Sequence, residues 1–227
     1  MVRDTNFLRN VPIFRDLKDH DLELMSDLWA PKYFKKGNLI VLEDETGAVL
    51  FVIVYGQVKI VRTDRDGREV ILAILGPRSL FGEMSILDGM TRSASAVATS
   101  PSKVLMIERK DFLKLLHAHP SIAISLLRSL TMRLRRADAK IKSLSLNNAA
   151  GRAANAILQL AEEVGVFYNG RVEIAQLPMR QEIANMAGIT RETFCRVLRK
   201  FVQKGYIELQ GRKLVINNYE NFRDLHR

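Results

Sequence analysis

Residues 180–198 read RQEIANMAGITRETFCRVL, and their pattern predicts the structure of the C-terminal part of the chain. Ala184 lies four residues before Gly188, and a glycine there can adopt the left-handed backbone conformation that ends a first helix. The small side chain of Ala184 lets a second helix cross closely. Thr190 is a good N-cap for that second helix, and Glu192 favours its positive end. The pattern therefore predicts a helix-turn-helix. Its two helices are expected to share an apolar core of Ile183, Ile189, Phe194, Val197, Leu198 and Phe201.

The outward-facing residues of this motif have the chemistry that reads DNA. Glu192 and Arg196 are four residues apart and share one face of the second helix, next to Arg191. Arginine can donate two hydrogen bonds to guanine O6 and N7, and a carboxylate can accept from cytosine N4. Arg180, at the start of the first helix, is placed for a phosphate. We expect the DNA contacts to include Arg180, Thr190, Arg191, Glu192 and Arg196.

Two further features favour DNA over an ordinary helical pair with a solvated face. Residues 206–216 predict a β-hairpin, the wing of a winged helix. The net charge is +10, which favours a polyanionic partner, either nucleic acid or an anionic membrane. Residues 1–120 hold 17 basic and 16 acidic side chains, residues 121–150 hold 6 and 1, and residues 151–227 hold 12 and 8. The basic excess therefore lies in the last 107 residues.

Composition excludes several classes of protein. Apolar residues make up 47% of the 227 residues, so the chain can form real cores. A single cysteine, Cys195, excludes an internal disulfide or a cysteine-only metal cluster within one chain. The longest apolar run, residues 48–55, is too short to span a bilayer, and the first ten residues lack the apolar core of a signal peptide. We expect a cytoplasmic protein with no metal site, no membrane partner and no enzymatic activity.

The sequence before the motif has a different character. Short β-rich runs at 39–42, 49–55, 57–62, 70–75, 94–98 and 104–107 alternate with turn residues. Short strands at nearly even spacing predict an antiparallel barrel or roll. Helices are expected at residues 16–29 and 109–117. The fold class is therefore α+β: an N-terminal antiparallel, jelly-roll-like β-roll, a long helix and a C-terminal winged helix-turn-helix.

The long helix is expected to open at Pro120. Its apolar positions follow steps of 3, 4, 3, 4 and 3, which is a heptad seam flanked by Arg and Lys. The seam residues are Leu127, Leu130, Leu134, Ala137, Ile141 and Leu144. We expect a two-stranded coiled coil and hence a homodimer. The alternative is an amphipathic helix packed on its own domain. Asn147 and Asn148 form a predicted hinge, followed by a helix over residues 152–163.

A second informative stretch, residues 81–96, reads FGEMSILDGMTRSASA. Gly82 allows close backbone approach at the start of a short helix, where free N–H groups make an anion site. Glu83 could accept a ribose hydroxyl proton, while Arg92 and Ser93 could bond phosphate oxygens. An acidic group for a sugar beside a basic group for a phosphate fits a cyclic nucleotide. The alternative is a plain helix–turn–strand with a Glu83–Arg92 salt bridge.

Together these motifs resemble the cyclic-AMP receptor protein / fumarate-nitrate regulator family of bacterial transcription factors over nearly the whole chain. The resemblance implies a cyclic-nucleotide-binding β-roll at 1–120, a dimerisation helix at 121–147 and a winged helix-turn-helix at 148–227. It also implies a palindromic DNA operator and RNA polymerase as partners. In the nucleotide site, Gly82 and Glu83 would hold the ribose side, and Arg92 and Ser93 the cyclic phosphate. The other implied contacts are Ile60 and Leu72 as walls, and Arg133 beside the nucleotide.

The sequence departs from the family where the nucleotide base is expected. The positions on the dimer helix that match the family's usual hydroxyl or amide pair are Ala137 and Asp138. The side chain of Ala137 cannot hydrogen-bond, and an ionised Asp138 only accepts, which suits guanine at least as well as adenine. The effector is therefore expected to be cyclic AMP, with cyclic GMP possible. The rival functions are a same-fold regulator answering to cyclic di-GMP, haem, a gas or redox state, or needing no ligand; an enzyme of nucleotide metabolism; and a basic membrane-surface protein.

Overall fold

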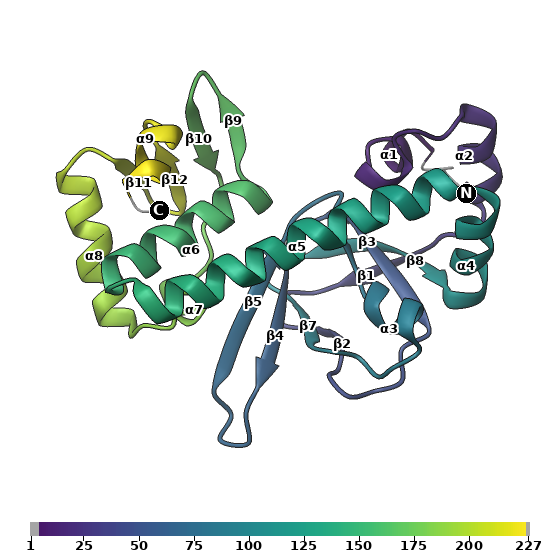
Figure 1. The fold of residues 1–227 in the computed structure, drawn as a ribbon, viewed down its shortest axis with the longest axis horizontal. Coiled ribbons are helices and arrows are strands. Elements are labelled where there is room, and N and C mark those ends of the chain that lie inside the picture. Colours follow the sequence, from purple (N-terminus) through teal and green to yellow (C-terminus); the bar gives the residue numbers. More distant parts are fainter. Residues whose placement is uncertain (1–4, 226–227) are drawn as a thin grey trace. The chain divides into compact units, whose positions relative to one another are not determined.

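The computed structural model describes residues 5–225 (Figure 1). The chain forms two compact units. The first contains the described residues up to Ile60 together with Leu75–Arg135, and the second contains Val61–Ile74 together with the described residues from Arg136 onward.

The first unit begins with short helices and continues into antiparallel strands. The helices are α1 (Thr5–Arg9), a 3₁₀ turn (Pro12–Phe14), α2 (Asp19–Ser26), α3 (Glu83–Asp88) and α4 (Arg109–Ala118). The strands are β1 (Ala30–Phe34), β2 (Leu39–Val41), β3 (Val49–Tyr55), β4 (Val58–Thr63), β5 (Glu69–Leu75), β6 (Leu80–Phe81), β7 (Ser95–Ala98) and β8 (Ser102–Glu108). One sheet has the order β1-β8-β3-β6 and the other β2-β7-β4-β5. The β4–β5 hairpin beyond Ile60 belongs to the second unit.

The core of the first unit explains why β3 reads as an unbroken apolar run. Leu50 and Val52 pack with Phe14 and Phe112 of the flanking helical segments. Phe51, one position away, faces the opposite side of the sheet, where its ring stacks on Phe81 at a centroid distance of 4.9 Å. A strand covered on both faces needs apolar residues at consecutive positions.

The helix after the roll is α5 (Pro120–Leu146), which is continuous over 27 residues (Figure 1). Proline stands at its first position, where its missing N–H costs no helical hydrogen bond, and the interior contains neither glycine nor proline. Most of the seam is exposed in the single chain: Leu134 and Ile141 are both 64% exposed. An apolar stripe left in water on an otherwise charged helix favours a partner helix over packing on the same domain.

The second unit is a helical domain with a small sheet. Its helices are α6 (Ala149–Val164), α7 (Arg180–Ala187), α8 (Arg191–Gln203) and α9 (Tyr219–Asp224), and its strands are β9 (Val166–Tyr168), β10 (Arg171–Ile174), β11 (Ile207–Gln210) and β12 (Lys213–Ile216). The sheet order is β11-β12-β10-β9. Ile157, Ile183, Phe194 and Ile216 are fully buried in its core. The predicted α+β fold class, with β-roll, long helix and winged helix-turn-helix, is confirmed.

Several elements differ from the sequence prediction. The helix predicted over residues 16–29 is observed as α2 (Asp19–Ser26), which is shorter at both ends. Pro31 disfavours the helical conformation at Ala30, where β1 begins. Proline is tolerated in β1 because this strand lies at the edge of its sheet. The strands β1, β6, β9 and β10, the helices α1 and α9 and the 3₁₀ turn were not predicted.

Candidate functional site

Gly82 lies at the start of α3, in the segment predicted to bind phosphate. It is the N-cap of α3 and has φ +81°, a left-handed conformation that glycine adopts without strain. A side chain there would also meet the Nη1 atom of Arg92 at 2.7 Å. Glycine therefore permits both the turn and the close approach of Arg92.

Glu83 presents one carboxylate oxygen without a partner. The residue is only 2% exposed. Its Oε1 accepts a hydrogen bond of 2.7 Å from Nη1 of Arg133, on α5. Its Oε2 is buried and has no hydrogen-bond partner among residues 5–225. A buried acceptor left unpaired is costly, and a hydroxyl group of a bound ligand is the kind of donor that would satisfy it.

Arg92 is the buried cation of the site, 7% exposed. Its Nη1 donates to the carbonyl of Gly82 and to Oγ of Ser85, each at 2.9 Å, and its Nη2 donates to the carbonyl of Val49 at 2.7 Å. Burial lowers the pKa of the guanidinium, and the charge of Glu83 opposes that shift. The alternative of a Glu83–Arg92 salt bridge is not formed, because Glu83 pairs with Arg133.

The remaining predicted nucleotide residues have varied surroundings. Ser93 is exposed beside Arg92, and its hydroxyl lies 3.4 Å from Sδ of Met84. Ile60 is half-buried on β4. Leu72, Ala137 and Asp138 are exposed and belong to the second unit. The structure thus brings together Gly82, Glu83, Arg92 and Arg133 in the first unit. The nucleotide-binding roles of all these residues stay predictions.

Residues that the motif analysis did not use surround Arg92. Ser85 is 3% exposed and accepts from Arg92, and the backbone of Gly47 lies directly against the guanidinium. Ser85 stands inside the motif, two residues after Glu83, so its spacing on the short helix was a usable signal. Gly47 had no such signal, because 45 positions separate it from Arg92 in the sequence.

The helix-turn-helix is formed as predicted. Gly188 ends α7 with φ +62°, and Oγ1 of Thr190 caps α8 by accepting from the backbone N–H of Thr193 at 3.2 Å. Arg191, Glu192 and Arg196 are exposed on α8. Nη1 of Arg180, at the start of α7, is buried and has no hydrogen-bond partner within the described part of the chain. The three exposed side chains of α8 have the chemistry to contact base edges and phosphates.

The wing is the hairpin of β11 and β12. Gly211 has φ +61° in its turn, where glycine is favoured. The neighbouring Arg212 donates two hydrogen bonds, of 3.2 and 3.0 Å, to the carbonyl of Leu177. These bonds fix the tip of the wing to the segment that leads into α7.

Polar side chains from α5 and α6 hold the backbone of β5 inside the second unit. Nζ of Lys140 donates to the carbonyl of Ile71 at 2.9 Å, and Nε2 of Gln159 donates to that of Leu72 at 3.1 Å. Glu163 accepts from the N–H of Ile74 at 3.1 Å. Burial raises the pKa of Glu163. The strand that carries the predicted pocket wall Leu72 is therefore hydrogen-bonded to helices of the second unit.

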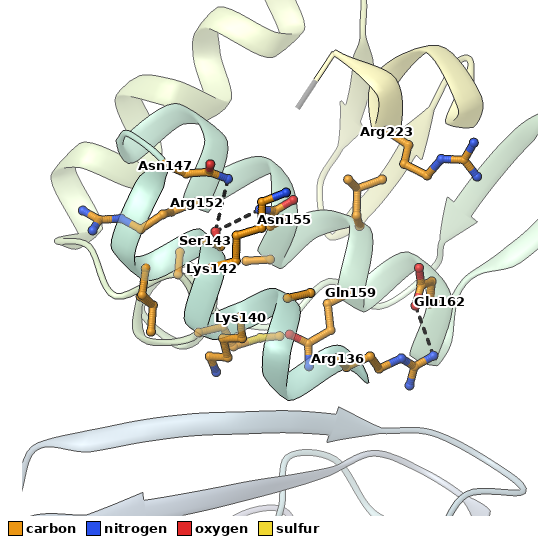
Figure 2. A pocket seen from close by; sticks show the side chains of 16 residues that line it. Arg136, Lys140, Lys142, Ser143, Asn147, Arg152, Asn155, Gln159, Glu162 and Arg223 are labelled. Atoms are coloured by element: carbon orange, nitrogen blue, oxygen red, sulfur yellow. Dashed lines mark hydrogen bonds and ion pairs between the residues drawn. The ribbon is translucent and has the colours of Figure 1, made fainter. Parts of the chain in front are cut away.

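A cavity of about 330 Å³ lies at the predicted hinge, among α5, α6 and the end of α7 (Figure 2). Near its centre, Oγ of Ser143 accepts from Nδ2 of Asn155 at 2.9 Å and from Nδ2 of Asn147 at 3.4 Å. Figure 2 shows the guanidinium groups of Arg152 and Arg223 pointing away from Ser143 on opposite sides. Arg136 pairs with Glu162 and Lys140 donates to the carbonyl of Ile71, so these four cations do not converge on one point.

Within residues 5–225, no group of three or more His, Cys, Asp or Glu side chains is arranged to hold a metal ion. Over the same residues, no helix combines the length and the apolar character needed to cross a membrane.

Comparison with known proteins assigns both parts of the chain. Residues 31–119 match the cyclic nucleotide-binding domain family, and residues 151–225 match the Crp-like helix-turn-helix domain. The CRP-like cAMP-activated global transcriptional regulator of Mycobacterium tuberculosis is 32% identical over 213 residues, covering 94% of this chain and 95% of that protein. The cyclic AMP receptor protein of Thermus thermophilus is 34% identical over 203 residues, covering 89% and 90%.

The fold is shared with solved structures. The structure of FixK2 from Bradyrhizobium japonicum aligns with a TM-score of 0.78 at 24% identity, covering 88% of this chain and 98% of that one. A cyclic nucleotide-binding domain joined to a winged helix-turn-helix defines a DNA-binding transcription regulator, not an enzyme. The chain belongs to the CRP/FNR family of transcriptional regulators.

Proposed function

We propose that this protein is a homodimeric, cyclic-nucleotide-responsive transcriptional regulator that binds a palindromic DNA operator in the cytoplasm. The observation that carries the proposal is the presence of two buried, oppositely charged side chains, Glu83 and Arg92, in one site. Glu83 keeps a buried, unpaired acceptor for a sugar hydroxyl, and Arg92 is a buried cation for a phosphate. We propose the functional limits 1–120, 121–147 and 148–227 for sensor, dimer helix and DNA reader, and RNA polymerase as a partner.

The effector is proposed to be cyclic AMP, which the names of the M. tuberculosis and T. thermophilus relatives support. Cyclic GMP is the second candidate, because Asp138 is exposed on α5 and its ionised carboxylate can only accept hydrogen bonds. Guanine offers two adjacent donors, N1–H and N2–H₂, whereas the adenine amino group is a single donor group.

Calorimetric titration of the full chain with cyclic AMP, cyclic GMP and cyclic di-GMP tests this proposal. We expect saturable binding of cyclic AMP, or of cyclic GMP if Asp138 faces the base. Replacing Asp138 with Asn removes the charge and adds donors, so cyclic GMP affinity should fall more than cyclic AMP affinity. Absence of binding to both mononucleotides would refute the assigned effector class.

The dimer is proposed on the seam of α5. Leu134 and Ile141 stand in water on a helix whose flanks are charged, and burial against a second α5 would remove them from solvent. Two protomers related by a twofold axis would place two α8 helices about one DNA turn apart, roughly 34 Å, which matches a palindromic operator.

Arg133 gives the nucleotide site a direct connection to the dimer helix. Its guanidinium donates to Glu83, within residues 81–96, and to the carbonyl of Leu80, directly before them. On α5 it lies next to the seam residue Leu134. A nucleotide that engages Glu83 therefore acts on the group that Arg133 holds, and we propose that this contact realigns the seam and the hinge at Asn147 and Asn148. Such a ligand must bind the DNA-competent state more tightly, since equal affinity shifts no equilibrium.

The residues proposed to read bases should act differently from those that contact phosphates. Replacing Arg191 with Ala removes a two-donor contact to guanine and should weaken binding to the cognate site by roughly 1–3 kcal/mol, with little effect on random DNA. Fluorescence anisotropy on a selected operator and on a random duplex, at one salt concentration, measures both values. Equal losses on the two duplexes would make Arg191 a phosphate contact.

A further inference from the structure

The guanidinium of Arg92 is held so that one of its edges stays free. An arginine side chain carries five N–H donors, one on Nε and two on each Nη. Nη1 uses both of its donors on Gly82 and Ser85, and Nη2 uses one on Val49. Among the contacts of the described residues, Nε–H and one Nη2–H remain. Nε and Nη2 lie along one edge of the planar group, and two donors on one edge suit two oxygens of a phosphate.

The backbone of Gly47 covers one face of this planar group. A methyl group added at Gly47 would lie 2.2 Å from Nε, 2.4 Å from Cζ and 2.6 Å from Cδ of Arg92. These nearly equal distances place the added carbon above the plane and not at the hydrogen-bonding edge. The ring of Phe51 adds a cation–π contact, with its centroid 5.8 Å from Cζ. Only a glycine at position 47 leaves room for Arg92 in this orientation.

The loop that carries Gly47 is fixed to the segment that carries Arg92. The backbone N–H of Arg92 donates to the carbonyl of Glu45, and that of Asp44 donates to the carbonyl of Arg92, each at 2.9 Å. Thr46 and Thr91 form a β-bridge. Gly47 lies outside the left-handed region, so its backbone accepts alanine. An added methyl group would therefore displace the Arg92 side chain and leave the loop in place.

The guanidinium of Arg92 donates three hydrogen bonds, and Ser85 is the only one of the three acceptors that is a side chain. It is 3% exposed on α3, so the Arg92 donor it satisfies has no water to replace it. A buried arginine already held in its binding orientation loses less conformational freedom when the ligand arrives than a mobile one does.

We propose that Gly47 and Ser85 are positioning residues of the phosphate site. Gly47 leaves space over the face of the guanidinium, and Ser85 holds Nη1, so that Arg92 presents its Nε–Nη2 edge to the anionic phosphate of a cyclic nucleotide. This inference rests on the proposed function and names the residues that determine how tightly and in which orientation the phosphate is held.

The test compares Gly47→Ala and Ser85→Ala with two matched controls in the full chain. Ser102 is equally buried, at 2% exposure, and its hydroxyl also bonds within the first unit, but its partners are the carbonyls of Ser100 and Gln57. Gly37 has φ +85° and nothing within 4 Å of an added methyl group, so alanine there strains the backbone without touching Arg92. Calorimetry with cyclic AMP and cyclic GMP gives affinity, and thermal unfolding of the unliganded protein gives stability.

We expect Gly47→Ala and Ser85→Ala to weaken nucleotide binding by about tenfold or more, the effect of losing a hydrogen bond to a charged group. Ser102→Ala and Gly37→Ala should bind as wild type does, and Ser85→Thr, which keeps the hydroxyl, should bind better than Ser85→Ala. The two phosphorothioate diastereomers of cyclic AMP provide a readout that stability alone does not move. The wild type should discriminate between them, and both positioning variants should discriminate less.

Unchanged affinity and unchanged diastereomer discrimination in Gly47→Ala and Ser85→Ala would overturn the proposal. The proposal would also be overturned if Gly47→Ala and Ser85→Ala lost no more nucleotide affinity than control variants whose unfolding temperature fell by the same amount. If the wild type binds neither nucleotide, the proposed function fails and the positioning role fails with it, a result that is distinct from wild-type binding that the variants leave unchanged.

Discussion

Replacing Arg92 with Leu should abolish cyclic-nucleotide binding while leaving a folded protein. The substitution removes the buried cation and both donors on its free edge, and hydrogen bonds to charged groups contribute about 1.5–3 kcal/mol each. Affinity should therefore fall by at least about 100-fold, which calorimetry with cyclic AMP and cyclic GMP measures. The carbonyls of Val49 and Gly82 and the hydroxyl of Ser85 also lose their donor. We expect a lower unfolding temperature as a secondary effect.

Arg15 supplies the control for this prediction. It is an exposed arginine in the same unit, so Arg15→Leu removes the same charge from the protein without changing residues 81–96. Its nucleotide affinity should match that of the wild type. Retained affinity in a folded Arg92→Leu protein would show that the phosphate is held elsewhere.

The second large effect is expected at the seam of α5. Changing Leu134 and Ile141 together to Glu places four carboxylates where two helices are proposed to meet. Burying a Leu or Ile side chain contributes about 1.5–3 kcal/mol, so the dimer loses about 6–12 kcal/mol. The variant should sediment as a monomer at concentrations where the wild type is a dimer. It should also lose most of its operator affinity, because the two half-sites are then bound independently.

Leu24→Glu is the matched control for the seam. Leu24 is as exposed as the seam residues, at 65%, but lies on α2. The Leu24→Glu protein should sediment as a dimer and bind the operator as tightly as the wild type does. A Leu134→Glu, Ile141→Glu protein that remains a dimer would mean that the apolar stripe of α5 serves another purpose.

Local signals in the sequence were sufficient to predict the helix-turn-helix and most strands of the β-roll. Gly188 and Thr190 define the turn and the cap through their own backbone chemistry, and both are found in those roles. The hairpin of β9 and β10 was missed although Asn169 and Gly170 form a strong turn signal. Its first strand, Val166–Tyr168, is exposed throughout and lacks the alternation that marks a half-buried strand. Two-residue β6 and six-residue α9 are too short for a periodicity to be read.

The residue types of the candidate site could be predicted from the sequence, but the hydrogen-bond partners of Glu83 and Arg92 could not. Glu83 and Arg92 follow from their residue types and spacing, and the same reasoning left a salt bridge between them open. The structure pairs Glu83 with Arg133 instead, over 50 positions of sequence, and surrounds Arg92 with backbone from Gly47 and Val49. Such contacts depend on how β3, α3 and α5 pack, which no local pattern encodes.

Operator affinity measured with and without nucleotide shows whether a cyclic nucleotide controls DNA binding. A duplex selected from a random pool by the wild-type protein provides the operator, and anisotropy at one fixed salt concentration gives the affinity in both conditions. We expect the wild type to bind at least about tenfold more tightly with saturating nucleotide, a coupling of about 1.4 kcal/mol, and Arg92→Leu to show no such gain. Equal affinity in the two conditions would contradict control of DNA binding by the nucleotide.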